Sequence, residues 1–251
     1  GSEMCIRDSG YTVATEMYSA GIDRLTHQPL SFSVSETTEG VHIHIIDAEL
    51  MGKGEKEKKD LYIEGVQNNG IINHYEYIIN SEGTIEIRHV LKPEGKMPLW
   101  FPRIGLTLTV SDALDQVKWY GRGPQENYPD RKTGYPMGIY ASTVQAMYEP
   151  YLMPQDYGLR TDVRWLQLTT DKGIGLQFKM NEWFNFNIYP YSTDNLTKAM
   201  YTYQLQKQKG MTLNLDYATT GVGCTARGVF GAYKAMPQEY RRTISIRPMM
   251  K

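Results

Sequence analysis

The chain has 251 residues, enough for one large β domain or two ordinary domains with a substantial core. Its 27 basic and 28 acidic side chains give a formal net charge of −1, so it lacks the basic surface that binds nucleic acids or anionic membranes. No apolar run approaches the ~20 residues of a membrane-spanning helix. We therefore expect neither nucleic acid nor membrane among its partners.

Residues 1–9, GSEMCIRDS, share neither the composition nor the periodicity of the sequence that follows. We assign them to a non-native leader derived from a tag or a sequencing adapter, and residues 10–251 to the folded domain. The two cysteines are Cys5, in that leader, and Cys224, so we expect neither a disulfide framework nor a four-thiolate zinc site. Cysteine content therefore does not distinguish the bacterial cytoplasm from the periplasm.

Apolar residues alternate with polar ones along much of the chain, which is the period of half-buried strands. Such rows occur at 30–34, 41–45, 85–88, 106–110, 174–180, 184–188, 201–205, 213–217 and 244–246. Hairpin turns are predicted at NNG (68–70), SEG (81–83) and DKG (171–173). The pattern predicts one all-β domain of about a dozen strands in packed sheets.

One short helix is predicted at 192–200. Ser192 can cap its N-terminus, and Leu196, Ala199 and Met200 supply an apolar side. The charge-rich segment 53–60, KGEKEKKD, is interpreted as a solvated loop rather than a binding patch.

The stretch 119–136, WYGRGPQENYPDRKTGYP, combines charged side chains with glycines and prolines. Glu126 and Asp130 resemble the carboxylate pair of a glycosidase, whose members lie about 5–5.5 Å apart in retaining enzymes and further apart in inverting ones. Each has a basic neighbour, and the prolines predict a rigid loop, so we favour ion pairs that hold a corner together. The residues assigned to this structural motif are Arg122, Glu126, Asn127, Asp130 and Arg131.

Two further groups have a weaker claim to chemistry. His42 and His44 lie on one strand face and could bind a metal, but no carboxylate or thiol is at ligand spacing, so a solvated face is favoured and no metal is assigned. The glycine-rich stretch 221–228 lacks the following helix of a phosphate-binding loop. It is interpreted as a loop at the rim of a sandwich, where binding residues often lie, with Cys224 as an inert apolar residue.

Several segments in order resemble the C-terminal, or small-chain, domain of glycoside hydrolase family 2 β-galactosidases. They are FPRIGL (101–106), WYGRGPQENYPDRKTG (119–134), YEPYLMPQDYGLRTDVRWLQLT (148–169), FNFNIYPYSTDNLTKA (184–199) and LNLDYATTGVG (213–223). The resemblance implies a large antiparallel β-supersandwich similar to galactose mutarotases. The family's R-A-P-x-D-N-D motif is missing ahead of Gly10, so we expect the first strands to be lacking.

The resemblance also implies the function. The catalytic glutamates and the magnesium ligands belong to a barrel domain with no counterpart here, so we expect no catalytic residue and no cofactor in this chain, and magnesium only in the barrel. The chain is thus expected to be inactive alone and to act as the C-terminal domain or small subunit of a retaining β-galactosidase. Its expected partners are the barrel, on the same chain or a large subunit, the galactoside substrate and further subunits of an oligomer.

Family members carry a tryptophan beyond the GVG motif that stacks on the sugar. The corresponding neighbourhood here contains Arg227, Gly228 and Phe230, which become the candidate substrate-binding residues. Two alternatives remain open: a mutarotase-like epimerase, which needs a histidine and a carboxylate facing one sugar, and a free-standing carbohydrate-binding module, which needs an exposed aromatic platform.

Overall fold

The computed structural model describes residues 21–22, 25–51, 69–223 and 228–250. The described part contains eleven antiparallel strands, one α-helix and short 3₁₀ turns, which confirms the all-β prediction. The strands are β1 (Thr26–Thr37), β2 (Gly40–Leu50), β3 (Gly70–Ile79), β4 (Ile85–Glu94), β5 (Arg103–Val110), β6 (Gln116–Arg122), β7 (Met137–Thr143), β8 (Arg160–Thr169), β9 (Gly175–Tyr189), β10 (Met211–Thr219) and β11 (Tyr240–Met249). None of the helices in these residues has the length and apolarity needed to cross a membrane.

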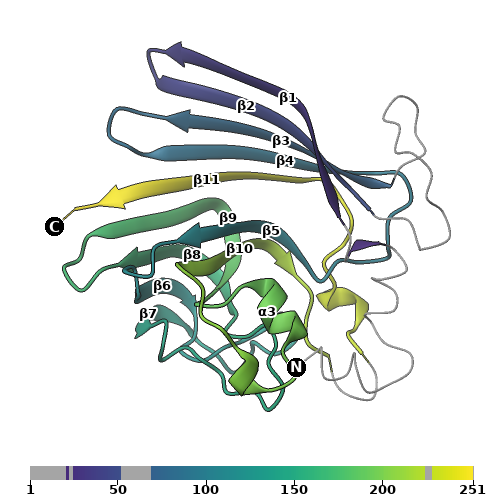
Figure 1. Cartoon of the computed structure of the whole chain (residues 1–251), viewed down its shortest axis with the longest axis vertical. Coiled ribbons are helices and arrows are strands. Elements are labelled where there is room, and N and C mark those ends of the chain that lie inside the picture. The colour runs from purple at the N-terminus through teal and green to yellow at the C-terminus, as the bar shows by residue number, and fades with distance from the viewer. Residues whose placement is uncertain (1–20, 23–24, 52–68, 224–227, 251) are drawn as a thin grey trace.

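The strands form one hydrogen-bonded sheet in the order β1-β2-β3-β4-β11-β9-β8-β6-β7, with β10 pairing both β9 and β5. Strand β9 joins the two layers, because residues 175–180 pair with β11 and residues 185–189 pair with β10. The two predicted rows 174–180 and 184–188 therefore belong to one long strand. In Figure 1, β1–β4 and β11 fan out above while β5 and β10 run below them.

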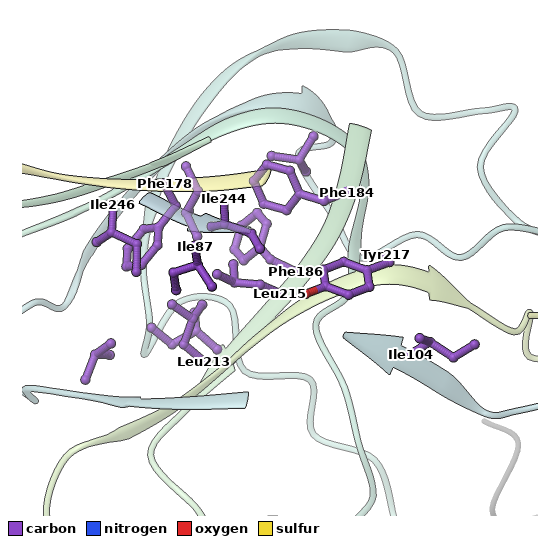
Figure 2. Packing of buried hydrophobic residues seen from close by; sticks show 14 of the residues in the cluster. Ile87, Ile104, Phe178, Phe184, Phe186, Leu213, Leu215, Tyr217, Ile244 and Ile246 are labelled. Atoms are coloured by element: carbon purple, nitrogen blue, oxygen red, sulfur yellow. The ribbon is translucent and has the colours of Figure 1, made fainter. Parts of the chain in front are cut away.

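The core lies between these layers (Figure 2). Ile87 of β4 and Ile244 of β11 face Leu213 and Leu215 of β10, and phenylalanines of β9 such as Phe186 lie among them. Leu213, Leu215, Phe186 and Ile244 are completely buried. Burying a side chain of this size stabilises the fold by about 1.5–3 kcal/mol, so the apolar faces of the alternating strands supply the driving force.

The local predictions can be compared directly. The helix α3 (Thr193–Lys198) begins after Ser192, whose side chain accepts a hydrogen bond from the Asn195 backbone N–H at 3.0 Å, as predicted. Turns occur at 81–83 and 171–173, with Gly83 and Gly173 at φ values of 76° and 78°. The turn predicted at NNG (68–70) is tested only in part, because residue 68 lies outside the described residues. The predicted loop 53–60 lies outside them as well.

The strand predicted at 201–205 is wrong. This segment forms a 3₁₀ turn, Thr202–Gln204, in which the Gln204 side chain accepts hydrogen bonds from the backbone N–H groups of Met200 and Tyr201. Tyr203 is 79% exposed, so the alternation here does not correspond to a buried face.

Candidate functional site: the corner and the rim loop

The corner at 119–136 begins within β6, which ends at Arg122. The Arg122 Nε donates to Asp162 Oδ2 at 2.5 Å, and its Nη1 donates to the backbone carbonyls of Lys132 and Tyr135 at 3.2 and 2.9 Å. Lys132 Nζ lies 2.7 Å from Asp162 Oδ1. Asp162 therefore neutralises two cations and fixes both sides of the corner.

Asp162 has a left-handed backbone, with φ of 56°, at an irregularity in β8. Burial alone would raise the pKa of its carboxyl, but hydrogen bonds from Lys132 and Arg122 outweigh burial and hold that pKa below its ordinary value. Aspartate tolerates this backbone region better than most residues. Asp162 lies within the family segment 148–169, but the sequence alone assigned it no role.

Glu126 is buried within the corner and its carboxylate is surrounded by donors. Arg131 Nη2 donates to Oε1 at 2.9 Å, and the Gly158 backbone N–H donates to Oε2 at 2.8 Å. The hydroxyl groups of Tyr128 and Tyr151 also donate to this carboxylate. Glu126 thus connects the corner to the segment before β8.

Asn127 and Arg131 extend the same connection. The Asn127 Oδ1 accepts from the Thr161 backbone N–H at 3.1 Å and from the Thr161 hydroxyl at 2.5 Å. The Arg131 guanidinium also lies over the Tyr128 ring, 5.3 Å from its centroid. The corner is therefore attached to β8 through both side chains and backbone.

Asp130 reaches in the other direction, to the GVG loop. Its Oδ1 accepts from the Val222 backbone N–H at 3.0 Å and its Oδ2 from the Gly223 N–H at 2.6 Å. A Cβ on Gly221 would lie 2.3 Å from Asp130 Cγ, so only glycine allows this approach. The two motifs, about 90 residues apart, thus form one unit.

The candidate substrate-binding residues follow this loop. Arg227 lies outside the described residues, as does Cys224. Gly228 has φ of 62°, and Phe230, which precedes a 3₁₀ turn at Gly231–Tyr233, is 71% exposed. The structure places Gly228 and Phe230 on the chain segment after the loop that Asp130 holds.

A hollow of about 280 Å³ lies between the corner, β8–β10 and the segment after the rim loop. Its lining includes Lys132, Asp162, Trp183, Asn185 and Thr219. Trp183 is 54% exposed, with the Arg164 guanidinium 4.5 Å from its ring centroid. Polar groups around a partly exposed indole are suited to hydroxyl-rich molecules.

The geometry limits the chemistry of this site. A general acid or base needs a carboxyl oxygen within hydrogen-bond reach of the substrate. Both oxygens of Glu126, of Asp130 and of Asp162 are occupied by donors from the protein. The described corner can shape the hollow beside it and offer polar groups to a ligand, but its carboxylates are not arranged for proton transfer.

A second polar network was missed by sequence reasoning. Arg103 Nη2 donates to Asp216 Oδ2 at 2.9 Å and to Asn187 Oδ1 at 3.2 Å, and Asn187 Nδ2 donates to Asp156 Oδ1 at 2.8 Å. Asn214 Nδ2 donates to Asn187 Oδ1 at 2.8 Å. Four of the five family segments contribute residues to this network. These residues are far apart along the chain, so the sequence alone does not show that they meet.

The histidines are divided among different environments. His89 is buried, with Nε2 3.0 Å from Asn73 Oδ1 and Nδ1 2.7 Å from the Tyr217 hydroxyl. Burial, together with nearby His74, lowers the pKa of His89 to about 4. His27 is exposed and lies 3.1 Å from Asp47, whereas His42 and His44 share one face of β2.

An exposed aromatic pair lies after α3. The rings of Tyr201 and Tyr203 stack with centroids 5.5 Å apart and planes 8° apart, and the residues are 57% and 79% exposed. Trp100 and Trp119 are buried, so they contribute to packing rather than to a surface platform.

The relatives found by comparison with known proteins are beta-galactosidases, the family that the sequence motifs resemble. Beta-galactosidase of Priestia megaterium is 38% identical over 147 residues, which cover 59% of this chain and 14% of that protein. Beta-galactosidase of Vibrio cholerae is 31% identical over 207 residues, covering 82% of this chain and 18% of that protein. The chain therefore spans less than a fifth of the length of these curated relatives.

A solved structure of a GalM/aldose epimerase homologue from C. elegans aligns with 88% of this chain and 69% of its own, with a TM-score of 0.42 and 12% identity. The model of the family described as beta galactosidase small chain matches residues 11–246. The chain belongs to the beta-galactosidase small chain family.

Proposed function

We propose that this chain is the non-catalytic C-terminal domain or small subunit of a retaining β-galactosidase, where it forms part of the active-site rim. The observation that carries the proposal is the attachment of the GVG loop to the corner by Asp130, which accepts two backbone hydrogen bonds. A loop held by two charge-assisted hydrogen bonds is a preorganised wall for a site that other residues complete.

Phe230 is an exposed aromatic side chain that could reach beyond the domain. It is 71% exposed and follows the anchored loop. An exposed aromatic ring can pack on the apolar face of a sugar, and the polar hollow near the same loop offers groups for hydroxyls. We assign Phe230, with Gly228 and Arg227, to contact with a galactoside held mainly by the barrel.

A different face supports association with the rest of the enzyme. Phe32 and Val34 of β1 are 68% and 54% exposed, and they pair with Ile45 and Ile43 of β2 on one side of the sheet. Exposed apolar faces mark interaction surfaces in proteins that are otherwise well packed. We propose that other parts of the β-galactosidase cover this face, and that the complete enzyme is an oligomer.

Magnesium does not fit the described residues. The groups of three ligand side chains that converge there, His42, His44 and Glu76, and His27, Asp47 and Glu49, both contain histidine. Magnesium prefers oxygen ligands in octahedral geometry. We therefore assign magnesium to the catalytic barrel and derive no step through it here.

The test is complementation. The purified chain should not hydrolyse an aryl β-galactoside, and addition of the matching barrel polypeptide should restore hydrolysis. Phe230→Ala should raise KM in the reconstituted enzyme, whereas Leu152→Ala, at a residue that is 88% exposed, is the matched control. Hydrolysis by the chain alone, or full activity of the barrel alone, would contradict the proposal.

A second candidate function is sugar epimerisation, favoured by one observation. His89 and Glu49 line the same cavity of about 200 Å³, and burial raises the pKa of Glu49 above its ordinary value. Both nitrogens of His89 are already engaged with Asn73 and Tyr217, so this function ranks second. Polarimetry of the unmutated chain with free galactose decides it, because unchanged mutarotation excludes the activity.

The stacked pair Tyr201 and Tyr203 is the feature that would support a free-standing carbohydrate-binding module. Calorimetric titration with galactosides tests this alternative. Heat that disappears in Tyr203→Ala would establish binding at the pair, and no heat at millimolar ligand would exclude it.

A further inference from the structure

The outer face of β2 and β3 brings together three side chains that the corner and the rim loop do not use. His42 and His44 lie two residues apart on β2 and therefore on the same face. Glu76 on β3 is directly opposite His44 in the antiparallel register. One ligand atom from each of these three residues lies within 4.8 Å of the others.

His42 is poorly satisfied in this position. Its side chain is only 12% exposed, and its Nε2 is buried without a hydrogen-bond partner among the described residues. Its Nδ1 lies 3.6 Å from Glu76 Oε1, beyond hydrogen-bond distance, and its Nε2 lies 3.9 Å from Glu39 Oε2. The Nδ1 atom, which faces Glu76, is therefore the nitrogen available to a bound ion, while Nε2 is directed toward the Glu39 carboxylate.

Glu76 is oriented toward the histidines by a neighbour. Arg88 on β4 donates to Glu76 Oε2 at 3.1 Å and to Glu86 Oε1 at 2.8 Å. This arrangement leaves Oε1 facing His42, in the way that outer groups orient the ligands of metal sites. Glu86 also offsets the positive charge of Arg88 near a cation.

We propose that His42, His44 and Glu76 bind a divalent transition-metal ion of the Zn²⁺ class. Two imidazoles and one carboxylate suit zinc, whereas magnesium and calcium prefer oxygen ligands alone. Zinc–nitrogen distances of about 2.0–2.1 Å place tetrahedral ligands about 3.4 Å apart, close to the observed 3.6 Å between His42 and Glu76. Small side-chain rotations bring in His44.

The site has an open side and a structural consequence. The β1 residues opposite His44 and His42 are Ser33 and Ser35, which are small and exposed, so water can take the fourth position. The ion links β2 to β3 by side chains in addition to the backbone ladder. It therefore fixes the register of the two strands beside the edge strand β1.

The test is a zinc titration of the complete 251-residue chain after treatment with a chelator. Calorimetry should show one ion bound per chain, and zinc should raise the melting temperature because it binds the folded state. His42→Gln, His44→Gln and Glu76→Gln should each weaken binding roughly tenfold or more. His74→Gln is the matched control, because His74 lies on the same face of β3 outside the group.

The competing group is His27, Asp47 and Glu49, which lies on the opposite face of β2. His27 is 64% exposed and already bonded to Asp47, which makes it the weaker candidate. Zinc binding that is lost in His27→Gln but retained in His44→Gln would overturn the proposal. The absence of binding at submillimolar zinc, in a chain whose melting curve shows it folded, would overturn it equally.

Discussion

Asp130 holds Gly223 in place: its Oδ2 accepts the Gly223 backbone N–H at 2.6 Å while its Oδ1 accepts that of Val222. Beyond the end of β10, the carboxylate therefore accepts the two backbone N–H groups that a neighbouring strand would otherwise accept. The GRGPQENYPDR and GVG motifs are therefore joined in one structural unit through Asp130.

Replacing Asp130 by asparagine should loosen the loop. An amide offers one acceptor oxygen and turns a donor toward the second N–H, so the unfolding free energy should fall by about 1.5–3 kcal/mol. Urea unfolding measures this change, and reconstituted galactosidase activity should fall with it. Asp171→Asn, in the exposed turn between β8 and β9, should change neither quantity.

Gly221→Ala tests the same contact from the opposite side. The new Cβ would lie 2.3 Å from Asp130 Cγ, so the carboxylate must move and stability should fall by roughly 1–3 kcal/mol. Gly134→Ala in the same corner has open space around the added Cβ and should be close to neutral. Equal melting temperatures for the two variants would show that the loop does not approach Asp130 closely.

Arg103→Met should be among the most destabilising single changes at a polar residue. It leaves Asp216, which is 2% exposed, without its cation, and breaking a buried pair costs about 3–5 kcal/mol. Burial already raises the pKa of Asp216 to about 6, against the opposing effect of Arg103, and the variant should raise that pKa further. Arg241→Met removes an exposed pair with Glu239 and should cost less than about 1 kcal/mol.

His89 should make the domain less stable in mild acid. Its pKa is about 4 in the folded state and 6.5 ordinarily, so between these values the unfolded chain binds more protons. The His89 contribution is complete above pH 6.5, and about 2 kcal/mol of it is lost at pH 5. Denaturant unfolding from pH 7 to 5 should show this slope, His89→Gln should reduce it, and His27→Gln should retain it.

Local sequence patterns predicted much of the secondary structure. Alternation identified strands such as β5 and β10, Ser192 marked the start of α3, and Gly83 and Gly173 marked turns. These features depend on neighbours within a few residues, so period and turn chemistry suffice to predict them. The motifs likewise identified the family, which residues 11–246 match.

Other features required the folded chain. The alternation of Tyr201 and Tyr203 resembles that of a strand, but this segment pairs with none of the described strands and both side chains are exposed. The pattern alone therefore does not distinguish a strand from a turn. Glu76 joins His42 and His44 only through strand pairing. Arg103 meets Asp216 from 113 residues away. Such contacts depend on register and layer packing, which arise from the summed burial of many strands and leave no mark in any single segment.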